Sequence, residues 1–248
     1  ECVKKQVGRF RRMLREGTGM FRHVYLSGGC RMGNCNWKAS DAFAIKGGNN
    51  GEPHNHNDVG SFLYFIGEEE IISDLGAGEY TKAYFGPERY SVLCCSSRGH
   101  SVPILDGKEQ CKGETYRADA VNYSETGEIS ISFAGAYEKE SRKKLIRTAV
   151  FCRETGELQI KDCLKTAPLD NGFTENLVTR ENVSREKDRI RIGDRGTLKI
   201  DGVSPEKIQI IPCIHRDHQG KMETVFLIQW EADGKENIWR SRFVLCPE

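Results

Sequence analysis

Hydrophobic and polar residues alternate along most of the chain from about residue 37 onward. In GEISISF (127–133) apolar side chains occupy every second position, and ELQIKDCL (157–164) follows the same alternation except at Asp162. This is the period of a β-strand with one buried face. Short turns rich in Gly, Asp and Asn separate such segments, for example Gly67-Glu68 and Glu154-Thr155-Gly156. The pattern predicts an all-β fold, a large antiparallel β-sandwich of the supersandwich type.

The first 36 residues do not follow this alternation. KKQVGRFRRMLRE (4–16) places Val7, Phe10 and Leu14 at helical spacing, which predicts a short basic helix. The glycine-rich stretch that follows, to Gly33, is expected to be irregular, and no helix is predicted after residue 20. We therefore expect an N-terminal segment at 1–36, a single β-sandwich domain at 37–248, and a chain that is a fragment of a longer protein.

Composition narrows the classes of partner. The 248 residues carry a net charge of +1, so the basic footprint of a nucleic-acid-binding protein is missing and no nucleic-acid partner is expected. No run of about 18 apolar residues predicts a membrane helix. A basic run, Arg142, Lys143, Lys144 and Arg147, is interpreted as a solvated face.

The ten cysteines contain no C-x-x-C pair. Free cysteines favour a reducing, cytoplasmic compartment, with a periplasmic or secreted location left open.

Histidine and aspartate gather around NNGEPHNHNDVGSFLYF, which begins at Asn49. His54, His56 and Asp58 are spaced by two, so they share one face if this stretch is extended. Asp74 follows the apolar segment EEIIS, and His100 lies in SSRGHSV, both at junctions between a predicted strand and a loop. We expect these side chains to form a site rather than a merely polar turn.

Metal binding is one function of such a set. Two imidazoles and one carboxylate with an open fourth position are a standard Zn²⁺ site, and His56, Asp74 and His100 supply them. A rival interpretation is an Fe(II) oxygenase with His56, Asp58 and His100 as its facial triad. A second cluster in PCIHRDH contains Cys213, His215 and His218, and is interpreted as a strand end and a solvated loop.

Four segments occur in an order that resembles a known family. HNHNDVGSF, ISDLGAGEY, YFGPERY and SSRGHSVPILDGKEQ, within residues 43–110, are similar to the C-terminal β-sandwich of heparinase II/III-like polysaccharide lyases. The resemblance continues more weakly through the hairpin at 143–164. It implies a lyase that cleaves uronic-acid-containing polysaccharides, such as glycosaminoglycans or alginate, by β-elimination, with Zn²⁺ beside the cleft.

The resemblance also implies roles for individual residues. His54 matches the catalytic histidine that faces the substrate, as an acid/base or carboxylate-contacting group, and His56, Asp74 and His100 match the zinc ligands. Tyr80 and Arg89 fall in the segment that lines the cleft and are expected to contact substrate. Asp58 is expected to orient His56 or to cap its turn.

Family members carry an N-terminal α/α toroid, which supplies a tyrosine and an asparagine to the active site. This chain has no room for it, so we expect the toroid and an acidic polysaccharide as partners and no turnover from the isolated chain. Homodimer formation, the uronic acid, the sulfation pattern and endo or exo cleavage are left open. The alternative from another class is a non-catalytic carbohydrate-binding or structural module.

Overall fold

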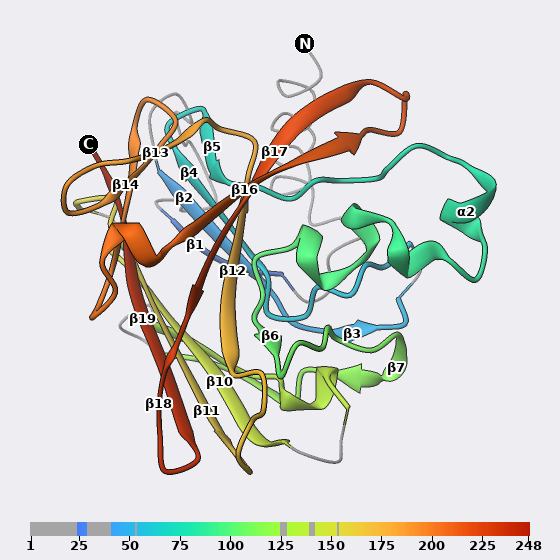
Figure 1. Ribbon diagram of the computed structural model, residues 1–248, viewed down its shortest axis with the longest axis horizontal. Helices are drawn as coiled ribbons and strands as arrows, with labels where there is room; N and C mark the ends of the chain where they lie inside the picture. The colour runs from blue at the N-terminus through green and yellow to red at the C-terminus, as the bar shows by residue number, and fades with distance from the viewer. Residues whose placement is uncertain (1–23, 29–40, 53, 125–127, 139–141, 153) are drawn as a thin grey trace.

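The computed structural model describes residues 24–28, 41–52, 54–124, 128–138, 142–152 and 154–248. Within them antiparallel strands are the main regular element (Figure 1). The first half contains β1 (Val24–Gly28), β2 (Ala42–Lys46), β3 (Asn49–Asn50), β4 (Phe62–Ile66), β5 (Glu69–Ile72), β6 (Ile104–Leu105), β7 (Gly113–Arg117), β8 (Ala120–Tyr123) and β9 (Glu128–Ser132). The second half contains β10 (Arg142–Phe151), β11 (Leu158–Thr166), β12 (Phe173–Thr179), β13 (Val183–Arg185), β14 (Ile190–Ile192), β15 (Gly196–Ile200), β16 (Gln209–Arg216), β17 (Met222–Glu231), β18 (Asp233–Lys235) and β19 (Ile238–Pro247).

Helical elements in the described residues are short. They are the one-turn helix α2 (Lys82–Phe85) and the 3₁₀ turns η1 (Arg89–Ser91), η2 (Leu93–Cys95), η3 (Ser97–Gly99), η4 (Ala134–Ala136) and η5 (Pro205–Lys207). The prediction of no helix after residue 20 is therefore wrong, because a single turn capped by Thr81 is too short to show helical periodicity. In the part of the chain that the structure describes, no helix has the length and hydropathy to cross a bilayer.

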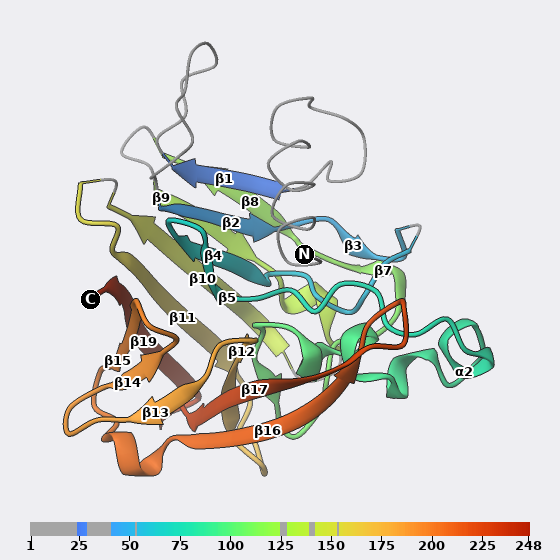
Figure 2. The same cartoon turned by 90° about the horizontal axis from the view of Figure 1, so that it is seen from above.

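Four sheets organise the described strands. The largest runs in the order β13-β14-β15-β19-β11-β10-β9-β8, with β18 paired to β19. The other sheets are β1-β2-β4-β5, β16-β17-β12-β6 and the small pair β3-β7. Figure 2 shows the β1-β2-β4-β5 sheet lying against the large sheet, and β16 and β17 along another side of the molecule. The predicted antiparallel sandwich is confirmed, including the turns after Ile66 and Phe151.

The N-terminal residues differ in part from the expectation. Residues 24–28, expected to be irregular, form β1 and pair with β2. The predicted helix at 4–16 lies outside the described residues, and the division at residue 37 stays a prediction.

Aromatic side chains join the sheets into one core. Phe62 on β4 stacks on Phe243 of β19 with ring centroids 6.3 Å apart, and Trp230 of β17 meets Phe243 edge-on at 5.1 Å.

 These three rings belong to three different sheets, so their packing fixes how the sheets lie against one another. β11 shows the alternation that sequence analysis predicts, with buried residues at every second position from Leu158 to Thr166. The core therefore holds the sheets rigidly enough to position the loops at their ends.

Candidate functional site

The expected site residues come from two connections between strands. The histidine loop, residues 51–61, joins β3 to β4. The long connection, residues 73–103, joins β5 to β6 and carries the turns η1, η2 and η3 and the helix α2, which lies at the outer edge of the molecule (Figure 1). The sheets provide the scaffold, and these two segments provide the chemistry.

The histidine loop is not an extended strand. His54 has a positive φ of 59°, and its side chain is exposed, whereas His56 is half-buried and Asp58 is buried. His54, His56 and Asp58 would share one face only in an extended strand. Turns interrupt the alternation here, so they do not. A positive φ is uncommon for a residue with a side chain, and such strained positions cluster at functional sites.

Polar side chains outside the predicted set hold this loop in place. Gln110 accepts from Val59 N at 3.0 Å and donates to Val59 O at 2.7 Å. Asn57 Nδ2 donates to Gln110 O, and Ser97 Oγ donates to Asn57 O. Sequence reasoning did not single out these residues, although Gln110 ends the motif SSRGHSVPILDGKEQ and Asn57 lies within HNHND.

A buried arginine joins the two segments. Arg147 on β10 is 0% exposed, and its Nη1 donates to Gly60 O at 2.8 Å and to Ser101 O at 2.7 Å. Its charge is matched by Asp162 on β11, at 2.5 Å, and it also contacts Glu175 of β12 at 3.3 Å. The interpretation of the basic run as a solvated face is wrong for Arg147, since the alternation of β10 points this residue inward.

Glycine permits the close approach of the histidine loop to the core. Gly60 has a φ of +88°, and a Cβ there would lie 2.8 Å from the ring of Phe133. Only glycine fits both the backbone angle and the space. The end of the loop is thus held between the aromatic core and the Arg147 guanidinium.

The structure places His56 and Asp74 near His100, although the ligand atoms of His56 group with Cys94 and Cys95 rather than with Asp74 and His100. The rings of His56 and His100 lie 5.1 Å apart, and Asp74 Oδ2 lies 3.6 Å from His100 Nδ1. Potential ligand atoms of Asp58, Asp74 and His100 all fall within 4.8 Å of one another. Asp58 also forms an ion pair with Lys46 at 2.5 Å, so its negative charge already has a partner.

The orientation of His100 fits a cation at this place. Its Nε2 faces the carbonyl of Cys94 at 2.9 Å, so Nε2 donates and carries the proton. Nδ1 is buried, and among the described residues no hydrogen-bond partner reaches it. A neutral His100 therefore directs a lone pair toward the Asp74 carboxylate, an arrangement that a metal ion between them would stabilise.

The pKa shifts of His100 and Asp74 agree with a neutral imidazole beside an ionised carboxylate. Burial lowers the pKa of His100 and keeps the ring neutral. Burial acts to raise the pKa of Asp74, but the neighbouring His100 and His56 outweigh it and hold that pKa below its usual value. An ionised carboxylate beside a neutral imidazole is the protonation state that a metal ligand set needs.

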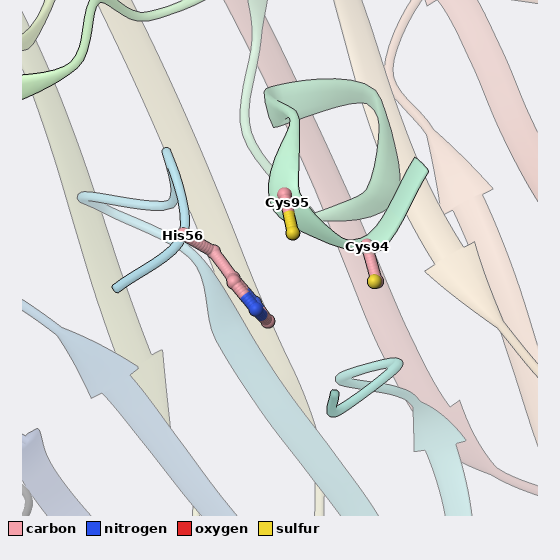
Figure 3. Close-up of side chains that lie close together, drawn as sticks. All are labelled: His56, Cys94 and Cys95. Carbon is pink, nitrogen blue, oxygen red and sulfur yellow. The ribbon is translucent and has the colours of Figure 1, made fainter. Parts of the chain in front are cut away.

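Two cysteines also lie close to His56. Ligand atoms of His56, Cys94 and Cys95 fall within 4.8 Å of one another, and Figure 3 shows the imidazole extending from its loop toward the turn that carries the thiols. A hydrogen bond from Cys94 lowers the pKa of Cys95, and His56 acts in the same direction. Burial would lower the pKa of His56, but its hydrogen bond with Cys95 and the nearby Asp74 raise it.

The two expected substrate contacts differ in exposure. Tyr80 is 60% exposed, and its ring lies 5.1 Å from that of Phe85, which is also exposed. Arg89 is half-buried and donates to Asn55 O and to Tyr84 O, both at 2.9 Å. Arg89 thus supports the histidine loop from outside, and substrate contact by either residue stays a prediction.

The second histidine cluster does not assemble as a ligand set. His215 on β16 is buried, and its Nε2 lies 3.1 Å from Leu75 O. No group of potential metal ligands in the described residues includes Cys213, His215 or His218. His215 instead supports the segment that follows Asp74.

Comparison with known proteins gives a consistent result. The sequence model of the family described as "Heparinase II/III-like, C-terminal" matches residues 41–230. No curated protein matches the sequence. The structure is similar to a heparinase III gene product, with a TM-score of 0.67 and 15% identity over 93% of this chain and 36% of that chain. It is also similar to the heparan sulfate lyase HepC from Pedobacter heparinus, with a TM-score of 0.62 and 15% identity over 91% of this chain and 35% of that chain.

At this level of identity the solved structures show a shared fold. The chain spans little more than a third of the length of those two proteins. The family model, by contrast, covers most of the chain and includes the histidine loop, Asp74 and His100. The chain therefore belongs to the heparinase II/III-like C-terminal family.

Proposed function

We propose that this chain is the β-sandwich part of a polysaccharide lyase that cleaves uronic-acid-containing polysaccharides by β-elimination. The observation that carries the proposal is the strained, exposed His54, two residues from a His56 that packs beside His100 and near Asp74. Family membership supports the reaction class. The solved structures with this fold include a heparan sulfate lyase, which supports an acidic polysaccharide as substrate.

In this reaction a base removes the proton on C5 of the uronate while its carboxylate is neutralised. The bond between C4 and the glycosidic oxygen then breaks, a C4–C5 double bond forms, and an acid protonates the departing oxygen. His54 is exposed, so it can contact the sugar as the acid/base group or as the group that neutralises the carboxylate. Tyr80 and Arg89 are proposed as further substrate contacts on the long connection.

His56, Asp74 and His100 would hold a zinc ion beside His54, with Asp58 near the same ligands. The ion would supply a fixed positive charge that ties the long connection to the histidine loop. Because β-elimination needs no metal-bound hydroxide, we assign the ligands a structural role, which is to fix the position of His54. This arrangement does not require the Fe(II) chemistry of a facial triad.

The other half of the active site is proposed to lie on an N-terminal α/α domain. Solved proteins with this fold are nearly three times as long as the region they share with this chain, which leaves room for such a domain. We expect this chain alone to show no turnover on heparin, heparan sulfate, alginate or hyaluronan.

The test measures formation of the unsaturated product by its ultraviolet absorbance. In a protein that joins this chain to the α/α domain, His54→Ala is expected to lower kcat by about 100-fold or more, as loss of an acid–base group typically does. His218→Ala, at a histidine that belongs to no group of potential metal ligands in the described residues, is the control. Unchanged turnover in His54→Ala would exclude a catalytic role, and robust turnover from the isolated chain would refute the missing half.

A non-catalytic carbohydrate-binding module is the second candidate. The exposed pair Tyr80 and Phe85 favours it, because adjacent exposed aromatic rings mark a binding surface. Under this alternative, Tyr80→Ala weakens binding of an acidic oligosaccharide while His54→Ala leaves binding and any turnover unchanged. Equilibrium binding measured on both variants separates the two functions.

A further inference from the structure

The proposed lyase reaction makes no use of the paired cysteines. The group formed by His56, Cys94 and Cys95 shares no member with the group formed by Asp58, Asp74 and His100. Each group brings its ligand atoms within 4.8 Å of one another. The His56, Cys94 and Cys95 group is therefore a separate candidate site.

The backbone of the cysteine turn is fixed by the site itself. Cys94 O accepts from His100 Nε2 at 2.9 Å, and Cys95 O accepts from the backbone N–H of Asn57 at 3.1 Å. Cys95 N also donates to Val92 O at 2.9 Å, which closes the turn. Both cysteine side chains are 0% exposed, so their sulfur atoms are held in place rather than free to rotate in solvent.

The surroundings leave room for sulfur. A Cβ added to Gly78 would lie 2.9 Å from Cys94 Sγ, so glycine at this position is what allows the thiol to occupy its place. The guanidinium of Arg89 stacks on Tyr84, 4.5 Å from the ring centre, and its positive charge acts on Cys95. A positive charge near a sulfur ligand favours its anionic form.

A disulfide between these two residues is disfavoured by geometry. Adjacent Cα atoms are about 3.8 Å apart across a trans peptide, which is less than the roughly 4.4 Å minimum usual for a disulfide. Both cysteines are free thiols in the structure. A set of two thiolates and one imidazole binds zinc, cadmium and copper(I) in preference to hard cations.

We propose that Cys94, Cys95 and His56 form a second metal position, which binds a thiophilic ion of the zinc and cadmium class and competes with Asp74 and His100 for His56. On binding, each thiol releases its proton to solvent as a sulfur–metal bond forms, and no electron is transferred. A neutral imidazole offers one lone pair, so His56 serves one position at a time. The two positions share His56, but the sulfur ligands take no part in the proposed lyase reaction, so binding at this position can be tested without measuring turnover.

Cadmium titration of the reduced, metal-free chain tests the proposal. Formation of sulfur–cadmium bonds produces a charge-transfer band in the ultraviolet, which we expect to saturate. Cys94→Ser and Cys95→Ser should each weaken the band and lower the affinity by at least about tenfold, since even loss of a group that only supports a ligand costs that much. Cys213→Ser, which removes a half-buried thiol packed against the hydrophobic cluster that contains Cys94 and Cys95, should leave both unchanged.

Asp74→Asn separates this position from the zinc site of the proposed function. It should retain the sulfur–cadmium band, because Asp74 is not a ligand of the second position. A band lost as completely in Asp74→Asn as in Cys95→Ser would overturn the separate position and indicate one mixed centre. A band unaffected by either cysteine variant would overturn the proposal altogether.

Cadmium-113 NMR of the unmodified chain gives a measurement that does not depend on any variant folding. A chemical shift in the range of two sulfur ligands supports the position. A shift typical of nitrogen and oxygen ligands alone contradicts it. Loss of lyase activity in the His54→Ala protein has no bearing on either result, so failure of one proposal is distinguishable from failure of the other.

Discussion

Two polar clusters, one fully buried and one with a partly exposed carboxylate, differ in how their charges are balanced. In the arginine cluster, Arg147 is matched by Asp162 and held by two backbone carbonyls. In the histidine–carboxylate cluster, Asp74 faces the lone pair of a neutral His100. The charges of the first cluster are balanced within the protein, and the second cluster is the one that we propose to bind a cation. A charge that the protein neutralises itself is structural, and one that it leaves to an ion is a candidate binding site.

The largest expected effect comes from breaking the arginine cluster. Arg147→Met leaves the Asp162 carboxylate buried without its partner and removes the donor from Gly60 O and Ser101 O. Breaking a buried ion pair in this way typically costs about 3–5 kcal/mol. Urea denaturation should show this loss in the free energy of unfolding, and a loss below about 1 kcal/mol would contradict the structural role.

Metal removal should have the next largest effect on stability. This effect should come from the histidine–carboxylate cluster alone. At a zinc concentration 100-fold above Kd, binding stabilises the folded chain by about 2.7 kcal/mol. Chelation should therefore lower Tm, and Asp74→Asn should abolish most of the difference between the chelated and zinc-loaded protein.

Asp74→Asn is expected to have a different effect on the stability of the metal-free protein. The amide of Asn can donate to His100 Nδ1, where the carboxylate of Asp74 cannot, so Asp74→Asn is expected not to lower the stability of the metal-free chain. An unchanged melting curve after verified removal of zinc from the native chain would show that the cluster holds no stabilising metal.

Glu175 tests the balance of charge within the arginine cluster. Burial raises the pKa of Glu175 well above its usual value of 4.5, so the carboxyl is protonated in the folded chain at pH values where it ionises in the unfolded chain. Its contribution to stability therefore falls as pH rises above about 4.5. Glu175→Gln lacks this loss, so the stability of the variant relative to the native chain should rise between pH 4 and pH 8, as measured by denaturation at each pH.

The smallest effect is expected at an exposed ion pair on the same large sheet. Arg242 on β19 lies 3.5 Å from Asp201, and the two side chains are 53% and 58% exposed. Because solvent screens such a pair, Arg242→Met should change the free energy of unfolding by less than about 1 kcal/mol. It serves as the matched control for Arg147→Met, and a similar loss in both variants would remove the distinction between a buried and an exposed arginine.

The sequence predicted the strands well because period-two burial is a local property, as β11 shows. It could not reveal α2, which is a single turn, or the inward position of Arg147 within a basic run. The helix is too short to show helical periodicity, and the carboxylates that permit burial of Arg147 lie on other strands. The arrangement of His56, Asp74 and His100 was proposed through resemblance to a family, and the structure places His56 and Asp74 near His100. The spacing of two in HNHND misled, because turn residues break the strand pattern there.

The long-range hydrogen bonds of Arg147 affect the order in which the chain folds. Its hydrogen bonds join it to Gly60, 87 residues away in the chain, and to Ser101, 46 residues away. Contacts between such distant segments form slowly, because loop closure must precede them. The ligand cluster therefore assembles only when the native topology of the sheets is in place. Binding of a metal ion at Asp74 and His100 would report completion of the last steps of folding.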